Sequence, residues 1–220
     1  AASFDRAAID LPGVIGWHVG TETVSVSAML DDLCAGALAH VWTTRDGLIG
    51  LAALAAPGAS PDAVIDEYDQ IAVEPLPAPA DFAPLPSAIE IEHGRNWTRL
   101  TDIAGSVPDA LRARLSGDAQ VARAVSQVAA LFTGRSRALR VPGLYGVGAD
   151  ALARAEALRA LVDRIPIRLR VVTDRYRGQI DLGMTVRVAR RDVPGGWWSG
   201  VVAGWRETLA SQRVELDLWG

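Results

Sequence analysis

The C-terminal quarter of the chain constrains the fold most strongly, because its apolar and polar residues alternate. Residues 213–219 read RVELDLW, in which apolar side chains occupy every second position. Alternation of this kind is typical of a β-strand with one buried face. Related patterns occur at 167–173, 179–189 and 197–205. Four strands joined by short polar turns predict an antiparallel β-barrel-like or sandwich element over residues 166–220.

The N-terminal part mixes helical and strand patterns. Ser25 is a good helix-capping residue, and the apolar residues after it follow helical spacing, which predicts a helix over about 26–37. The β-forming segment 41–44 is followed by Arg-Asp-Gly at 45–47 and by an apolar segment at 48–54. Because an Asp-Gly pair tolerates the positive φ of a tight turn, these residues predict a β-hairpin.

A proline-rich stretch follows at residues 74–87, where five residues are proline. Prolines remove backbone donors, so this stretch is expected to be a linker. The alternating segment 89–94 then predicts a half-buried strand. With the helix and hairpin, these patterns predict a mixed α+β domain over residues 1–95, with strands that can pair with residues 166–220.

The segment between these parts, residues 96–165, is expected to be mainly helical. Apolar residues recur at helical spacing over 107–133, with a break near Gly117, and again over 150–162, where Asp150 is the expected N-cap. The predicted fold class is therefore α+β: a mixed helix and hairpin domain, a helical segment and a C-terminal antiparallel β-barrel-like element.

The composition disfavours several classes of function. The single cysteine, Cys34, and the three scattered histidines leave no disulfide framework and no structural zinc site. The apolar runs are much shorter than the roughly 20 residues of a membrane-spanning helix, so no span is expected. The sequence contains no P-loop, nucleophile elbow, His-Glu-x-x-His motif or dinucleotide fingerprint. We therefore expect no catalytic residues, no metal and no cofactor.

Charged residues are unevenly distributed along the 220-residue chain. The net charge is −4, but residues 1–94 carry −12 and residues 95–220 carry +8. All 22 basic residues are arginines, and they are interleaved with acids, so direct nucleic-acid binding is not expected. Two oppositely charged halves are instead expected to meet, either within the chain or between neighbouring subunits.

Trp197 and Trp198 are candidate interaction residues, because they follow a Pro-Gly-Gly loop at the start of an expected strand. Neighbouring side chains of a strand point to opposite faces, so one of the two indoles should point outward. An exposed indole either contacts a partner or covers a core or a subunit interface.

Several short motifs, taken in order, resemble the tail-tip or baseplate hub proteins of double-stranded DNA phages. The C-terminal end of that family shares the patterns of residues 181–188 (DLGMTVRV), 200–205 (GVVAGW) and 213–220 (RVELDLWG). Residues 24–33 and 42–51 resemble a helix and a hairpin of the same proteins.

The HGRNWT stretch at residues 93–98 also resembles the family, although the family commonly has Tyr at both aromatic positions, and Met184 replaces a usual Asp. Under this resemblance, Arg95 and Trp97 belong to a structural junction between the acidic and basic halves. They are the second pair of candidate interaction residues.

The resemblance implies a structural, non-enzymatic role. Such hubs are typically homotrimers that adapt the tail tube to the tip, with β-domains around a channel and fibre parts below. The expected partners are copies of the chain and other tail-tip proteins. The expected location is the virion tail, after assembly in the bacterial cytoplasm. Because the chain begins with Ala rather than Met, we expect it to be the C-terminal region of a larger tail protein.

Two alternatives stay open at this point. The first is a module that binds host-surface glycan or protein through Trp197 and Trp198. The second is a tail-associated cell-wall hydrolase, which the missing catalytic motifs disfavour.

Overall fold

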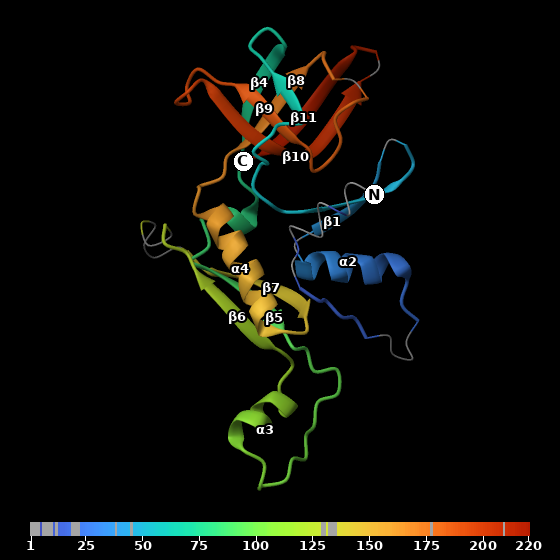
Figure 1. Ribbon diagram of the computed structural model, residues 1–220, viewed down its shortest axis with the longest axis vertical. Helices are drawn as coiled ribbons and strands as arrows, with labels where there is room; N and C mark the ends of the chain where they lie inside the picture. The colour runs from blue at the N-terminus through green and yellow to red at the C-terminus, as the bar shows by residue number, and fades with distance from the viewer. Residues whose placement is uncertain are drawn as a thin grey trace.

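The alternating C-terminal residues form strands of a curled, six-stranded half-barrel sheet in the computed structural model (Figure 1). Its strands, in order across the sheet, are β3 (Ala63–Ile65), β9 (Thr185–Ala189), β10 (Trp197–Thr208), β11 (Arg213–Trp219), β8 (Arg168–Thr173) and β4 (Gln70–Leu76). Neighbouring strands are antiparallel, except that β3 and β9 are parallel. The structure describes residues 5, 11, 13–18, 23–37, 39–44, 46–128, 131, 136–176, 178–208 and 210–220.

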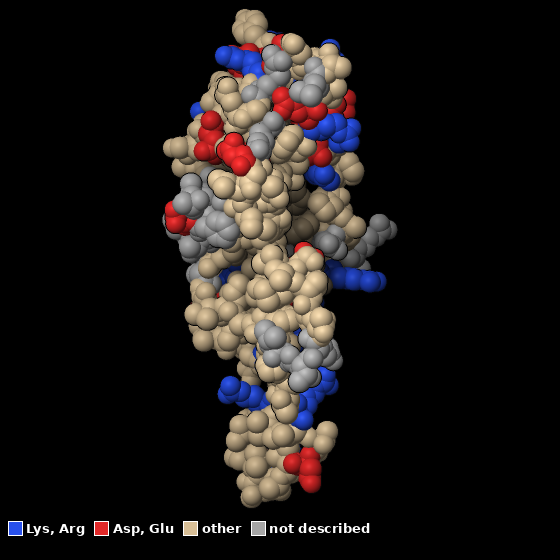
Figure 2. Space-filling model, turned by 90° about the vertical axis from the view of Figure 1, so that its right-hand side faces the viewer, with Lys and Arg blue, Asp and Glu red and all other residues tan. Residues whose placement is uncertain are grey.

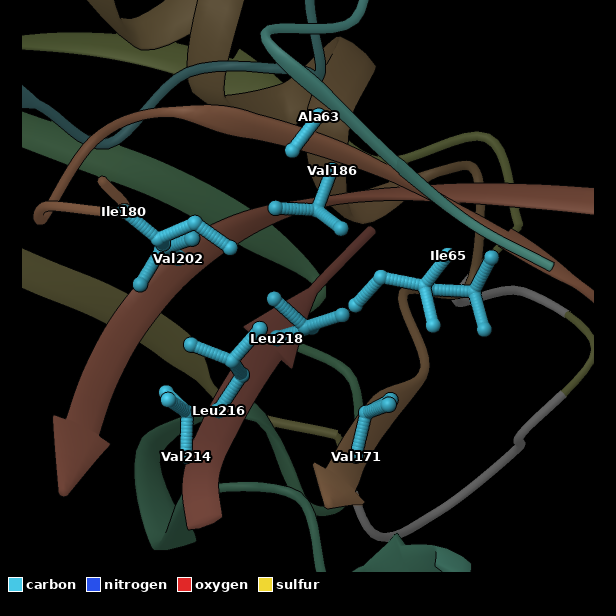
Figure 3. Packing of buried hydrophobic residues seen from close by; sticks show 10 residues of the cluster. Ala63, Ile65, Val171, Ile180, Val186, Val202, Val214, Leu216 and Leu218 are labelled. Carbon is cyan, nitrogen blue, oxygen red and sulfur yellow. The ribbon is translucent and has the colours of Figure 1, made fainter. Parts of the chain in front are cut away.

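The curl of this sheet encloses an aliphatic core. Val214, Leu216 and Leu218 of β11 are fully buried, as their alternation with Glu and Asp requires. Figure 3 shows them pointing toward apolar side chains of the opposing strands and of the turn before β9. The β-branched and Leu side chains that fill this space make the C-terminal strands one packed unit.

A second, three-stranded sheet forms the other half of the molecule. Its order is β6 (Gln120–Val125), β5 (Ala88–His93) and β7 (Ala138–Tyr145), with β5 antiparallel to β6 and parallel to β7. The helix α4 (Gly148–Val162) packs against β5 and β6, and α2 (Val26–Ala37) packs against β7. Ile89 and Ile91 meet the apolar face of α4 in this second core.

The remaining elements connect or extend these two halves. A two-stranded hairpin, β1 (Ala39–Thr43) and β2 (Ile49–Ala53), follows α2, and a short 3₁₀ helix, η1 (Ala80–Phe82), follows β4. The helix α3 (Asp109–Ser116) lies in a lobe at the end of the molecule farthest from the six-stranded sheet (Figure 1). None of the residues of α3 is buried, so this lobe has no core of its own.

The α+β fold class is confirmed, and so are several individual elements. The helix over 26–37 has the expected bounds, and Ser25 Oγ accepts a hydrogen bond from the backbone N–H of Ala28 at 3.2 Å. The predicted hairpin is β1–β2, and Gly47 in its turn has a positive φ of 73°. The strands expected at 167–173 and 197–205 are β8 and β10.

The helix expected over 107–133 is wrong beyond Ser116. After Gly117 the chain forms the strand β6, which pairs with β5 along its whole length. The sequence of β6 alternates small buried alanines, Ala122 and Ala124, with exposed residues. Pairing with β5 and packing under α4 override the helical propensity of these alanines. Residues 129, 130 and 132–135 of the expected helix lie outside the described residues.

Two further expectations are corrected by local contacts. Asp150 does not cap α4, which begins at Gly148; its carboxylate instead accepts a hydrogen bond from Val14 N at 3.4 Å. The expected linker begins too early, because its residues 74–76 belong to β4. Pro75 fits this strand because β4 is at the edge of the sheet, where a missing backbone donor leaves no neighbouring strand unpaired.

The six-stranded sheet combines strands from distant parts of the sequence. Both β3 and β4 lie within the first 95 residues, and they pair with β9 and β8 of the C-terminal region. The domain limits at residues 95 and 165 stay predictions.

Candidate functional site

A surface pocket brings together Arg95 and Trp97, two of the residues singled out from the sequence. We call it the Arg95 pocket; it has a volume of about 410 Å³, and its walls include Trp17, His18, Gly94, Arg95, Trp97 and Arg114. The pocket lies where the N-terminal segment, the end of β5 and the α3 lobe meet. Figure 2 shows arginine side chains on both sides of the narrow neck above this lobe.

Backbone contacts at the ends of two strands hold the floor of the Arg95 pocket. Gly94 follows β5 with a positive φ of 57°, and its N–H donates to the carbonyl of Tyr145 at 2.7 Å. Ile15 forms an antiparallel bridge with the same Tyr145, and Gly16 N donates to Leu144 O at 3.0 Å. These bonds place Trp17, the next residue, against the turn that follows β5.

Asn96 fixes the turn that carries the two candidate residues. Its side-chain N–H donates to Leu115 O at 2.7 Å, and its Oδ1 accepts from Thr98 N at 3.1 Å. Asn96 N also donates to Asp118 O at 2.6 Å. The bonds to Leu115 and Asp118 tie the turn to the end of α3, and the bond from Thr98 closes the turn itself, so the backbone that carries Arg95 and Trp97 is held on both sides of Asn96.

The side chains of the Arg95 pocket form a stack around the Trp97 indole. The Arg95 guanidinium carbon lies 4.7 Å from the centroid of that ring, within the range of a cation–π contact. The His18 ring lies 5.7 Å from the Trp97 ring with an interplanar angle of 33°. Trp97 nevertheless keeps 44% of its surface exposed, so the ring remains accessible to a ligand.

Trp197 and Trp198 lie elsewhere, at the start of β10, and neither lines the Arg95 pocket. The Arg187 guanidinium carbon lies 4.8 Å from the Trp197 ring centroid. Trp198 packs against the core of the six-stranded sheet and lines a different pocket, of about 440 Å³, with Leu161 and Arg164. Both indoles are half-buried, so an interaction role for this pair stays a prediction.

The sequence did not reveal Trp17, His18 and Arg114 as members of a site. Trp17 and His18 lie in a Gly- and Pro-punctuated segment, and Arg114 lies on a short helix with several other charged residues. Only the meeting of β5, β7 and α3 brings them together. No local pattern in the sequence signals this grouping.

The acidic and basic halves of the sequence meet within the chain. Within the described residues, four ion pairs join a carboxylate of the first 94 residues to an arginine of the remainder: Glu90–Arg123, Glu92–Arg140, Asp69–Arg175 and Glu67–Arg191. Two of the four lie on the three-stranded sheet, and two join the turn between β3 and β4 to the C-terminal region. Intramolecular contact therefore accounts for part of the charge separation.

Neither a metal centre nor a membrane span is found in the described part of the chain. Among those residues, no three or more His, Cys, Asp or Glu side chains are grouped so that they could hold a metal ion. None of the helices in that part is long and apolar enough to cross a membrane.

No protein-family model matches the sequence, and no curated protein is significantly similar to it. Among solved structures, 88% of the chain superimposes on 38% of a chain in the "Virion of native gene transfer agent (GTA) particle", with a TM-score of 0.57 and 11% identity. A tail protein from Neisseria meningitidis MC58 matches 83% of the chain over 51% of its own length, with a TM-score of 0.46 and 12% identity.

The 43 kDa tail protein of prophage MuSo2 from Shewanella oneidensis matches 82% of the chain over 49% of its own length, with a TM-score of 0.43 and 11% identity. Of these three, the virion chain has a TM-score above 0.5, and at 11% identity this likeness establishes a shared fold. The chain spans about half or less of the length of each of these proteins.

Proposed function

We propose that this chain is a structural component of the tail of a phage-like particle. The observation that carries the proposal is the fold shared over 88% of the chain with a chain of a gene transfer agent virion. A fold by itself does not define a function, but here it agrees with an independent resemblance in sequence. The chain then acts through assembly rather than catalysis.

The resemblance to hub proteins supports a more specific place, at the tail tip. Its three C-terminal motifs fall in adjacent parts of one sheet: the turn before β9 with most of that strand, the middle of β10 and the whole of β11. Gly183 in the first motif has a positive φ of 78°, as its turn requires. We infer that the chain is part of a baseplate hub that connects the tail tube to distal tip or fibre parts.

Self-association into a trimer is part of this proposal. The six-stranded sheet is not closed, because β3 and β4 are its two edges. An open edge presents unpaired backbone groups, which a second copy or another tail protein can cover. The fold therefore offers surfaces for a ring of subunits around a channel.

Immunogold electron microscopy of particles from a strain that encodes the chain tests the proposal directly. We expect gold labels at the distal end of the tail. If the particles carry no gold label, the structural role in the virion is refuted. If the label runs along the whole tube, the tip position is refuted. Light scattering on the purified chain tests the trimer separately, since a stable mass of three chains is expected.

A further inference from the structure

The Arg95 pocket carries two guanidinium groups and no carboxylate in its wall. Neither Arg95 nor Arg114 forms an ion pair with any carboxylate among the described residues, whereas most arginines on the neighbouring strands do. A guanidinium is weakly hydrated and presents two parallel N–H donors, which match the two oxygens of a carboxylate. The pocket is therefore built to attract one anionic group.

Flat apolar surfaces lie beside these charges. Trp97, which keeps 44% of its surface exposed beside Arg95 and His18, and the partly buried Trp17 are both in the wall of the pocket. An indole buries the C–H face of a ring-shaped ligand, while the polar groups at the ligand's edge remain free to bind the arginines. A sugar ring with one carboxylate has both of these features.

The floor of the pocket leaves room for such a ring. Three glycines, Gly16, Gly94 and Gly146, line the pocket, and a Cβ added to any of them would meet no atom within 4 Å. With a volume of about 410 Å³, the pocket is within the size range of small-molecule sites.

The surroundings of the pocket favour a singly charged unit over a nucleic-acid strand. A strand needs a row of cations along its phosphates. Here two carboxylates lie near the wall: Asp118, whose backbone carbonyl accepts from Asn96 N, and Asp150, which accepts from Val14 N. A polyphosphate backbone that left the pocket would meet these negative charges, whereas one acidic sugar inside it would not.

We propose that the Arg95 pocket binds a uronic acid unit of a polysaccharide, with Arg95 and Arg114 on its carboxylate and the indoles on its ring. This inference does not rest on the proposed tail role. It assigns a saccharide-binding surface to Arg95 and Trp97, at a distance in sequence and structure from Trp197 and Trp198.

Isothermal titration calorimetry on the full chain tests the proposal with oligomers of galacturonate, glucuronate and mannuronate, and with the same oligomers after reduction of their carboxyl groups. We expect submillimolar binding of at least one acidic oligomer and at least about tenfold weaker binding of its neutral counterpart. Arg95→Gln should weaken the binding of the acidic oligomer by at least about tenfold. Arg187→Gln is the matched control, since it removes the other arginine stacked on a tryptophan and should leave the affinity unchanged.

Several outcomes would overturn the proposal. They are the absence of binding to all three oligomers, equal binding of acidic and reduced forms, and equal losses in the Arg95 and Arg187 variants. Tighter, Arg95-dependent binding of an oligothymidylate would show that the pocket serves nucleic acid instead. If Arg95→Gln unfolds the lobe by circular dichroism, Arg114→Gln provides the second variant. None of these results bears on the position of gold labels in the particle, so the two proposals fail independently.

Discussion

Trp42 and Asp181 are joined by a hydrogen bond of 3.1 Å between the indole Nε1 and the carboxylate Oδ1, although 139 residues separate them in sequence. The bond ties the β1–β2 hairpin to the turn before β9. Gly50, opposite Trp42 in the hairpin, leaves the space that the indole fills, because a Cβ there would lie 2.6 Å from the ring. The indole is thus one of the contacts that attach the hairpin to the turn before β9.

Trp42→Phe removes the donor of this bond while keeping an aromatic ring. We expect a loss of about 1–2 kcal/mol in the free energy of unfolding, since a hydrogen bond to a partly buried carboxylate is lost. Urea denaturation measures it. Trp197→Phe is the control, because Trp197 is also half-buried and its indole N–H has no partner among the described residues. A smaller loss for Trp42→Phe than for the control would contradict the role of the bond.

Gly183→Ala is expected to destabilise the protein by about 2 kcal/mol. The residue has a φ of 78°, and an added Cβ would lie 2.9 Å from Ala52 Cβ, so the substitution adds a steric clash to backbone strain. Gly178→Ala separates the two effects, since Gly178 has a φ of 68° with no atom near the added Cβ. We expect Gly178→Ala to lower the free energy of unfolding by about 1 kcal/mol. Thermal denaturation measures both variants. Equal losses of stability would show that the hairpin moves away from the added Cβ of Gly183→Ala without cost.

Arg154 is a buried cation that connects three elements. It is 2% exposed, and its guanidinium donates to the carbonyls of Ala37 and Leu54, each at 3.1 Å. Arg154→Met leaves the buried Ala37 carbonyl and the partly buried Leu54 carbonyl without this donor, so we expect a loss of about 1–3 kcal/mol in the free energy of unfolding. Arg164→Met, at an exposed position after α4, should change it by less than about 0.5 kcal/mol. Faster amide exchange at the end of α2 would accompany the first change only.

Acid is expected to loosen the end of α4 through Asp163. Burial opposes ionisation of this carboxyl, but hydrogen bonds from Ser126, Gln127, Arg159 and Val128 outweigh it and hold its pKa below the ordinary value. A lowered pKa in the folded state means that the carboxylate stabilises the fold above the unfolded pKa of about 3.9. This stabilisation is lost as the pH falls through the folded pKa.

The measurement is the melting temperature between neutral pH and about pH 2. Asp163→Asn should lower it at neutral pH and flatten its fall in acid. Ser126→Ala removes one donor, from a hydroxyl 2.5 Å from Asp163 Oδ1, and should cost about 1 kcal/mol at neutral pH. If the melting temperature of Asp163→Asn falls in acid as steeply as that of the parent chain, other carboxylates cause the acid sensitivity.

Sequence periodicity predicted the elements in which the spacing of apolar residues marks the buried face. The strand β11 alternates because one face meets the core, and α2 begins where Ser25 caps it. By contrast, β6 exposes Val121 and Val125 and buries only alanines toward α4, so its pattern reflects its partners rather than a strand signal. Local sequence cannot encode such pairing.

The same limit applies to the candidate site. Arg95 and Trp97 were found because they are close in a recognisable motif, and Asn96 between them holds their turn. Trp17 and Arg114 join them only through the bridge of Ile15 to β7 and the position of α3. Contacts between segments far apart in sequence leave no periodic signal. The residues of the pocket could therefore be grouped only from the three-dimensional structure.

The order of strands in the six-stranded sheet has a topological consequence. The last residue of β4, Leu76, is paired with the first residue of β8, Arg168, so the chain leaves the sheet and returns to it at neighbouring positions. Everything between them, including the three-stranded sheet, α4 and the α3 lobe, is an insertion in one long β-hairpin. A change in the length or sequence of residues 77–167 can therefore leave the strand pairing of the six-stranded sheet intact.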